Sequence, residues 1–317
     1  MSETILVTGA AGGNQGATGH RILHLLIERG FKVRALVHKI DQRSQRLEKL
    51  GVEVLSGNLL DLEAIGQALR GIKRAYFTYP VDDGLMEATA IFAAAARKAK
   101  TEMVVNMSQF QSTTTAPTLR NLQHRLADQI FDWADVGALH LNAPVFYENV
   151  RALITRTVTD QSTIYLPWGK GDAVFPLIGA EDVSRVAAAL LAADDLPTQT
   201  RYSLVGGVPT VGEIVDTLSR VLNRPIRYVE ITDDQWKKAT EERINRHALD
   251  HLSKLWRFFR TSGIQKGEQG FEVSNIIEKL TGQPPQTLDE FFRLNPDSFG
   301  GVGQPVYEDF SRGPVGP

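Results

Sequence analysis

Closely spaced glycines occur near the N-terminus, directly after a short apolar run. The run Ile5-Leu6-Val7 is followed by GAAGGNQGATG over residues 9–19. Residues this small let backbone N–H groups approach a phosphate, and the dipole of a following helix favours an anion at the helix start. The order of strand, glycine loop and helix is the context in which such a pattern binds a dinucleotide. The segment therefore predicts a pyrophosphate-binding loop.

The glycines fit the dinucleotide-binding spacing in two registers. Gly13-x-x-Gly16-x-x-Gly19 has the G-x-x-G-x-x-G spacing, and Gly9-x-x-Gly12 followed by Gly16 matches it with one residue inserted. No G-K-[ST] follows, which disfavours nucleoside triphosphate hydrolysis. We take the loop residues expected to contact the cofactor as a set: Gly9, Gly12, Gly13, Asn14, Gln15 and Gly16.

The second predicted strand, residues 33–37, ends in basic residues. His38 and Lys39 follow it, Arg43 lies one turn further on, and there is no acid before Asp41. Sites for NAD usually place an acid here to accept from the ribose 2′-OH, whereas cations hold the 2′-phosphate of NADP. The sequence therefore predicts NADP(H) as the preferred cofactor, with NAD(H) as the alternative.

The residues that several other kinds of chemistry require are absent from the sequence. None of the seven tyrosines is followed by lysine four residues later, so the Tyr-x-x-x-Lys pair of ordinary short-chain dehydrogenases is absent. The absence of G-x-S-x-G argues against an α/β-hydrolase, and the absence of cysteine excludes thiolate nucleophiles and disulfides. His247-x-x-x-His251 has the spacing of a metal pair but no third ligand, so we expect a solvated helix face and no metal.

Alternating strands and helices must position these residues. Strands are predicted at residues 5–7, 33–37, 52–55, 75–78, 103–107 and 138–141. Helices are predicted at residues 20–29, 43–50, 61–69, 84–99 and 119–134. This alternation is typical of βαβ units, and continuous apolar strands indicate a sheet that is covered on both faces. We therefore predict an α/β protein with a doubly wound parallel sheet of the Rossmann type. After Val150 the alternation breaks down.

Composition excludes some partners. The 317 residues carry 35 Lys+Arg against 37 Asp+Glu, so the net charge is -2, which argues against direct nucleic-acid binding. The N-terminus has no signal-peptide pattern, and the most apolar later stretch, residues 88–96, is too short to span a membrane. We expect a cytoplasmic protein that does not bind membranes.

Segments along the chain resemble the NmrA-like family of atypical short-chain dehydrogenase/reductase proteins. The resemblance rests on VTGAAGGNQG, FKVRALVHK, GVEVLSGNLLDLEAI, AYFTYP, VVNMSQF, HLNAPVFYENV, IGAEDVSRV, RPIRYVEITDDQW and LTGQPPQTLDEFFR. It implies a Rossmann domain that binds NAD(P) and a smaller, mixed α/β C-terminal part that binds the substrate. The implied divisions are 1–155 for the Rossmann domain, rejoined by about 178–200, then 156–177 and 201–293 for the substrate part, and 294–317 as an irregular tail rich in Gly and Pro.

The resemblance also implies roles for single residues. Asn58 and Leu59 would flank the adenine, where the family more often has Asp-Leu, and Tyr79 and Pro80 would lie beside the cofactor. Ser108 would lie near the nicotinamide. The residues that would line the substrate cleft are Pro144, Phe146, Tyr147 and Asn149.

Three residues are candidates for catalysis: His124, Ser108 and Tyr147. His124 occupies the position at which the family often keeps a lysine, before the sixth strand. It could deliver a proton, contact the cofactor or substrate, or do neither. Ser108 could equally be a polar strand end, and Tyr147 fits an aromatic wall better than a proton donor.

The function that follows is an NADPH-dependent oxidoreductase that transfers hydride to a small conjugated carbonyl, quinone or enone. The missing Tyr-x-x-x-Lys leaves a second hypothesis, a non-catalytic NAD(P)(H) redox sensor that acts through a protein partner. A non-redox biosynthetic enzyme on the same fold is a third. The oligomeric state is left as monomer or homodimer.

Overall fold

Seven parallel strands form the central sheet, in the order β10-β6-β5-β4-β1-β2-β3. The computed structural model describes residues 3–12, 17–111, 115–268 and 271–299. The strands are β1 (Thr4–Thr8), β2 (Lys32–Val37), β3 (Glu53–Ser56), β4 (Arg74–Phe77), β5 (Met103–Gln109), β6 (Ala138–Ala143) and β10 (Arg201–Ser203). The order reverses direction at β1, so the predicted doubly wound Rossmann sheet is confirmed.

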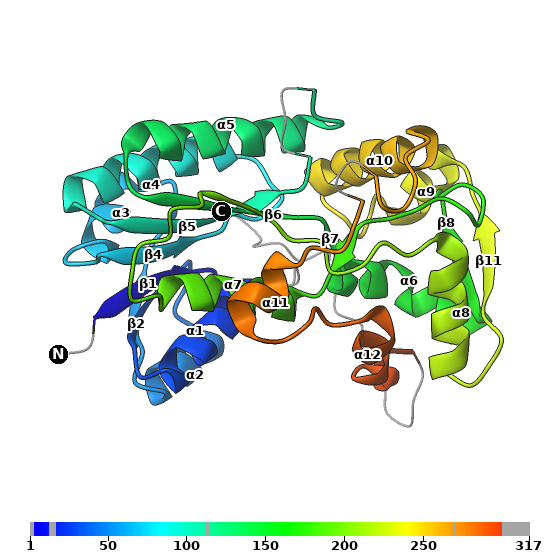
Figure 1. Cartoon of the computed structure of the whole chain (residues 1–317), viewed down its shortest axis with the longest axis horizontal. Helices are drawn as coiled ribbons and strands as arrows, with labels where there is room; N and C mark the ends of the chain where they lie inside the picture. The colour runs from blue at the N-terminus through cyan, green and yellow to red at the C-terminus, as the bar shows by residue number, and fades with distance from the viewer. Residues whose placement is uncertain (1–2, 13–16, 112–114, 269–270, 300–317) are drawn as a thin grey trace. The chain divides into compact units, whose positions relative to one another are not determined.

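Helices cover both faces of this sheet (Figure 1). One face carries α1 (Thr18–Glu28), α2 (Gln42–Lys49) and α7 (Ala180–Leu191), and the other carries α3 (Leu62–Ala68), α4 (Leu85–Ala99) and α5 (Leu119–Ala134). Under α4 and α5, the ring of Phe77 lies 4.9 Å from that of Phe92 and 5.3 Å from that of Phe131, measured between ring centroids. Burial on both faces explains why the strands are continuous apolar runs.

Polar residues set the starts of several helices. The carboxylate of Asp41 accepts from the backbone N–H groups of Arg43 and Ser44 and so caps α2. Asp61 caps α3 in the same way, and the hydroxyl of Thr118 accepts from Asn121 N to cap α5. These side chains satisfy N–H groups that have no partner inside the helix.

The chain divides into two units. Unit 1 comprises residues 1–143, 180–204 and 275–284, and unit 2 comprises residues 144–179, 205–274 and 285–317. The unit 1 boundary thus lies at Ala143, whereas the sequence placed it at 155. Residue 155 lies inside α6 (Tyr147–Gln161), a helix of unit 2 that the sequence did not predict.

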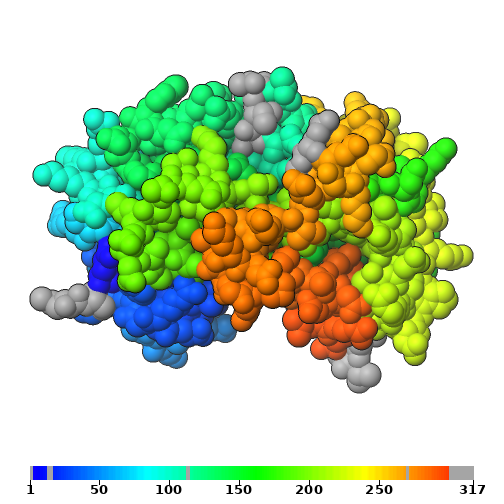
Figure 2. Space-filling view, in the orientation of Figure 1, coloured from blue at the N-terminus to red at the C-terminus, as the bar shows by residue number. Residues whose placement is uncertain are grey.

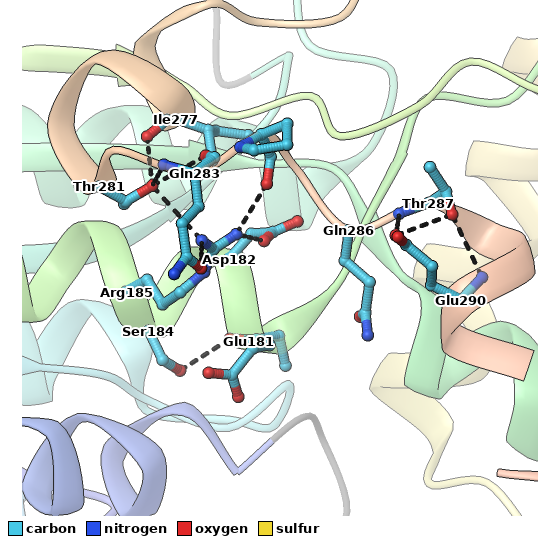
Figure 3. A network of polar contacts seen from close by, with 12 residues as sticks. Glu181, Asp182, Ser184, Arg185, Ile277, Thr281, Gln283, Gln286, Thr287 and Glu290 are labelled. Atoms are coloured by element: carbon cyan, nitrogen blue, oxygen red, sulfur yellow. Dashed lines mark hydrogen bonds and ion pairs between the residues drawn. The ribbon is translucent and has the colours of Figure 1, made fainter. Parts of the chain in front are cut away.

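In unit 1, a short late segment packs against α7. Helix α11 (Ile276–Thr281) lies against α7, as Figure 2 shows. Arg185 of α7 donates to Gln283 Oε1 at 2.7 Å and to the carbonyl oxygen of Pro284 at 3.1 Å, and it also pairs with the buried Asp182 (Figure 3). One arginine therefore binds this segment to the helix layer of the sheet.

Unit 2 has its own aromatic core. Trp168, Phe175, Trp256 and Phe259 are buried, and successive rings lie 4.9 to 5.9 Å apart. Its other elements are β7 (Val145–Phe146), β8 (Thr163–Leu166), β9 (Leu177–Ile178), α8 (Val211–Val221), β11 (Arg227–Glu230), α9 (Asp233–Thr240), α10 (Arg246–Thr261), α12 (Leu288–Arg293) and the 3-10 turn η1 (Pro296–Phe299).

Two predictions for unit 2 are corrected. Phe299 is buried against Phe292, so the beginning of the predicted irregular tail packs as part of the unit; residues 300–317 lie outside the described range. His251 is also buried, at 7% exposure, whereas a solvated helix face was expected. In both places the surrounding sequence is polar, but apolar residues close by in sequence form a core against which the residue packs.

Candidate functional site

The glycine loop follows β1 and leads into α1. Gly9 and Gly12 have φ values of +68° and +77°, and Gly12 N donates to the carbonyl oxygen of Gly9 at 3.3 Å. A side chain at Gly9 would also place its Cβ 2.8 Å from Thr78 Cγ2. Left-handed backbone and close approach both require glycine here. The four other predicted loop residues, Gly13, Asn14, Gln15 and Gly16, lie outside the described range.

Gly19 has the tightest packing of the described loop glycines. A Cβ at this position would lie 2.3 Å from the carbonyl oxygen of Thr8 and 2.8 Å from the carbonyl carbon of Gly9. Close packing of helix on strand is the role of the third glycine in a dinucleotide-binding turn. Gly19 was part of the spacing but not of the predicted contact set, so its role in bringing α1 onto β1 was missed.

The start of α1 suits an anion. Ala17, the N-cap residue, has φ 48° and ψ 34° and provides no side-chain cap, and the first turn of the helix contains no acidic residue. The first N–H groups of a helix have no partner within it, and the helix dipole adds a partial positive charge. Small residues, an uncapped helix start and the absence of an acid together fit the pyrophosphate of a dinucleotide.

Buried hydroxyl groups hold the loop from below. Thr18 Oγ1 and the hydroxyl of Tyr76 are hydrogen-bonded at 2.8 Å, and Thr8 Oγ1 accepts from Thr78 N at 2.9 Å. These bonds join the start of α1 and the end of β1 to β4. Burial raises the pKa of Tyr76 to about 12, so its hydroxyl is neutral in the physiological range.

The basic residues after β2 differ in their surroundings. His38 and Lys39 are exposed, and Lys39 forms no ion pair with any residue that the structure describes. Arg43 instead donates to Asp41 Oδ2 from Nε at 3.0 Å and from Nη2 at 2.7 Å. The hydrogen bonds from Arg43 lower the pKa of Asp41, which therefore stays ionised and offsets the charge of Arg43. Lys39 is thus the cation most available to a 2′-phosphate.

The residues predicted to flank adenine follow β3. Asn58 is exposed, and its Oδ1 accepts from Leu60 N at 3.0 Å. Leu59 is half-buried and packs against the core under α3 and α4. The Asn58 side chain therefore shapes the turn after β3, while Leu59 anchors this turn to the core.

Tyr79 and Pro80 follow β4 on a loop with its own hydrogen bonds. The hydroxyl of Tyr79 donates to the carbonyl oxygen of Asp83 at 2.7 Å, and Asp82 N donates to that of Pro80 at 2.8 Å. Burial, with a smaller contribution from Asp82, raises the pKa of Tyr79. The loop is therefore internally bonded at the carboxyl end of β4.

Ser108 lies near the end of β5 and is fully buried. Its Oγ accepts from Asn142 Nδ2 at 3.4 Å, and the same amide donates to the carbonyl oxygen of Gln109 at 3.1 Å. On α5, Asn121 Nδ2 donates to the carbonyl oxygen of Phe110 at 2.8 Å. The carboxyl end of β5 is thus held by amide side chains from both β6 and α5.

His124 lies on the buried face of α5, at 5% exposure. The helical period places it with Arg120, Asn121 and Ala127 on the face that packs toward the sheet. Arg120 and Asn121, which are 6% and 2% exposed, were not predicted. Their signal in the sequence was the appearance of polar residues at core positions of an amphipathic helix.

The sheet brings together the predicted residues of unit 1. Because the strands are parallel, the residues that follow β1, β2, β3, β4 and β5 lie along one edge of the sheet. Ligands of doubly wound sheets bind outside this carboxyl edge. The predicted residues concerned are Gly9, Gly12, His38, Lys39, Arg43, Asn58, Leu59, Tyr79, Pro80 and Ser108.

The predicted cleft residues belong to unit 2. Tyr147 is 1% exposed; its hydroxyl donates to the carbonyl oxygen of Gln286 at 3.2 Å, and its ring lies 5.3 Å from that of Phe291. Phe146 is also buried, whereas Pro144 and Asn149 are half-buried. These contacts give Tyr147 a packing role within its unit, which does not favour a role as proton donor.

The described residues contain neither a cluster of metal-ligating side chains nor a helix suited to crossing a membrane. Over the described ranges, no group of three or more His, Cys, Asp or Glu side chains could hold a metal ion. No helix in the same part of the chain is long and apolar enough to cross a membrane.

Comparison with known proteins agrees with the fold. The model of the NmrA-like family matches residues 1–124, so the resemblance to this family is confirmed. The sheet topology is that of a Rossmann fold, and residues 1–124 are similar to the NmrA-like family.

Similar proteins include both reductases and a regulator. The NAD(P)H azoreductase of Xenophilus azovorans is 24% identical over 295 residues, which cover 91% of this chain and 98% of the azoreductase. Triphenylmethane reductase of Citrobacter sp., solved as a complex with NADP(H), has a TM-score of 0.75 and 17% identity and covers 92% of this chain and 99% of its own. NmrA, a negative transcriptional regulator, has a TM-score of 0.78 and 16% identity, with coverage of 94% and 97%. At these identities, the structures show a shared fold.

Proposed function

We propose that the chain is an NADPH-dependent oxidoreductase that reduces a small conjugated acceptor, such as a quinone or an enone. The observation that carries the proposal is the carboxyl edge of the sheet in unit 1, where an uncapped helix start beside glycines is followed, after β2, by the exposed Lys39. The azoreductase and the triphenylmethane reductase, both named as reductases, support redox chemistry on this fold.

The bound cofactor would supply the hydride, and the protein would bind and orient it. The glycine loop and the start of α1 would take the pyrophosphate, and Lys39 would take the 2′-phosphate. Tyr79 and Pro80 would lie beside the cofactor, Ser108 would lie near the nicotinamide, and His124 would contact the cofactor or the substrate. Tyr147, Phe146, Pro144 and Asn149 would shape the substrate part.

The test of this proposal is NADPH oxidation with a panel of quinones, azo and triphenylmethane dyes and enones, together with calorimetry of cofactor binding. We expect micromolar-range binding of NADPH and turnover with at least one acceptor, as is common for enzymes. A chain that binds neither NADPH nor NADH contradicts the proposal.

The role of His124 is tested by two variants. If His124 donates a proton, His124→Ala should lower kcat about 10²-fold, the low end for general acid catalysis. If it only holds the cofactor, affinity should fall while kcat at saturation survives, and His124→Lys should restore binding. Unchanged affinity and kcat in His124→Ala would remove this residue from the site.

One observation favours a second function, a non-catalytic redox sensor. The only Tyr predicted as a proton donor, Tyr147, has its hydroxyl on a backbone carbonyl, and the similar NmrA structure is that of a transcriptional regulator. Tight binding of NADPH without turnover on any acceptor would favour the sensor. Preference for oxidised or reduced cofactor would then show which redox state it reports.

A further inference from the structure

Arg120 is a buried arginine to which the proposed function gives no role. It is the second residue of α5 and is 6% exposed. Its Nη1 donates to the carbonyl oxygen of Asp82 at 3.0 Å, and its Nη2 donates to that of Pro80. Its Nε is buried without a hydrogen-bond partner among the described residues.

No carboxylate contacts this cation within the described ranges. The side-chain carboxylates of Asp82 and Asp83 act on Arg120 as nearby charges and form no ion pair with it. Burial, the largest effect, lowers the pKa of Arg120 to about 10, so the guanidinium is still protonated at neutral pH. A buried cation that is held by neutral carbonyl groups is unfavourable for stability alone. Its position therefore calls for a role beyond packing.

The partners of Arg120 all belong to the loop between β4 and α4. This loop holds Tyr79 through its hydroxyl bond to Asp83, and it ends at Gly84, which has φ +92° and would place a Cβ 2.7 Å from the Tyr79 hydroxyl. The guanidinium spans two carbonyl groups of the loop at once. Because a planar fork of donors is needed to do this, lysine is not an equivalent replacement.

We propose that Arg120 is a positioning residue for the nicotinamide half of the cofactor. It binds the loop that carries Tyr79 and Pro80 to the first turn of α5, and His124 follows one turn later on the same buried face. Arg120 thereby fixes the distance between the β4 loop and His124. The inference rests on the proposed function, since it assumes that a dinucleotide lies along this edge of the sheet.

The test compares two ligands that share the adenine half. NADPH contains the nicotinamide, whereas adenosine 2′,5′-bisphosphate contains only the adenosine with its 2′- and 5′-phosphates. We expect Arg120→Met to weaken NADPH binding about tenfold, the effect of losing one interaction of about 1.4 kcal/mol. Binding of adenosine 2′,5′-bisphosphate should stay within twofold. Arg120→Lys should recover part of the NADPH affinity, because a single ammonium can still donate to one carbonyl group.

Arg74, whose Nε also lies 3.5 Å from Glu3 Oε2, provides a control at the opposite edge of the sheet. It is the first residue of β4, and its Nη1 donates to the carbonyl oxygens of Leu191 at 2.9 Å and Ala193 at 2.6 Å. Arg74→Met should lower stability and leave the affinity for both ligands unchanged. This variant shows whether losing any arginine that binds backbone carbonyl groups weakens NADPH binding, or whether the effect is specific to Arg120.

The outcomes separate the two proposals. If the unchanged protein binds neither ligand, the proposed function fails and the inference fails with it. If the unchanged protein binds both ligands and Arg120→Met still binds NADPH equally well, only the inference is overturned. Equal loss of both ligands in Arg120→Met, or an NADPH-selective loss in Arg74→Met, overturns it too.

Discussion

Gly19 shows how a single missing side chain determines the junction of strand and helix. A Cβ there would lie 2.3 Å from the Thr8 carbonyl oxygen, which is part of the backbone and cannot rotate away. We expect Gly19→Ala to lower the free energy of unfolding by about 3 kcal/mol, the upper part of the range for overpacking. Urea unfolding measures this.

Gly66 provides the control for that substitution. It lies within α3, and a Cβ there would have no atom within 4 Å. Gly66→Ala should therefore leave stability unchanged or raise it by up to about 1 kcal/mol, since alanine favours helix. If the two variants had the same stability, the close packing of α1 on β1 would not be the cause.

Asp41 and Lys39 set the charge after β2. Asp41→Asn keeps a good helix cap but removes the charge that holds Arg43. We expect it to raise NADPH affinity several-fold with little effect on NADH, because a second cation becomes available.

Lys39→Ala should weaken NADPH binding by about 1–3 kcal/mol and leave NADH binding unchanged. Calorimetry measures the affinity of each variant for NADPH and for NADH. A substitution that changes both affinities equally would contradict a contact with the 2′-phosphate.

The buried hydroxyl of Tyr76 predicts a loss of stability in alkali. Its pKa is about 12 in the folded protein and about 10 when unfolded, so only the unfolded chain releases the proton between these values. Stability is therefore lost as pH rises from about 10 to 12, by about 3 kcal/mol for two pKa units, and levels off above.

Tyr76→Phe separates this contribution from those of other groups. At neutral pH the variant should be about 1–2 kcal/mol less stable, because the Thr18 hydroxyl loses its partner. Above pH 10 the difference should shrink and then change sign. A difference that is constant from pH 7 to 12 would show that Tyr76 does not titrate with a raised pKa.

At the scale of elements, Arg185 connects parts of unit 1 that are 98 and 99 residues apart in sequence. Arg185→Met removes the bonds to residues 283 and 284 and leaves the buried Asp182 carboxylate without this arginine. We expect a loss of about 3–5 kcal/mol, as for breaking a buried ion pair. In hydrogen-exchange measurements, the substitution should speed amide exchange in α11 more than in α4, relative to the unchanged protein. Unchanged exchange in α11 would mean that other contacts hold it.

The elements that the sequence could predict are those whose apolar pattern has one clear period. The six strands of the alternating half, and the helices between them, follow from runs such as Ile5-Leu6-Val7 and from caps such as Asp61. Helix α6 could not be predicted, because it contains β-branched residues in succession, has no side-chain cap, and begins directly after a short strand.

The candidate site residues also divide into those that the sequence could predict and those that it could not. Gly9 and Lys39 could be predicted because they follow strands whose ends the sequence located. The ion pair of Arg43 with Asp41, the carbonyl contacts of Arg120 and the buried hydroxyl of Tyr147 depend on side-chain directions, which no spacing specifies. Arg120 was visible only as a charge on a core-facing helix position.

At the scale of the whole molecule, the chain alternates between the units instead of completing one before the other. It passes from unit 1 to unit 2 after Ala143, Leu204 and Pro284, and it returns after Gly179 and Ser274. Strand β10, which pairs with β6, and helices α7 and α11 thus reach unit 1 only from later segments. Neither unit corresponds to one continuous fragment.

This order has a consequence for synthesis on the ribosome. From Ala143 to Pro284 the ribosome must add 284 − 143 = 141 residues before the last segment of unit 1 exists. At ~5–20 residues per second, this takes roughly 7–28 s. Until β10 is made, the growing chain holds six strands of the sheet with the β6 edge open, and until α11 is made, α7 lacks the helix that packs against it. Exposed strand edges of this kind attract other chains.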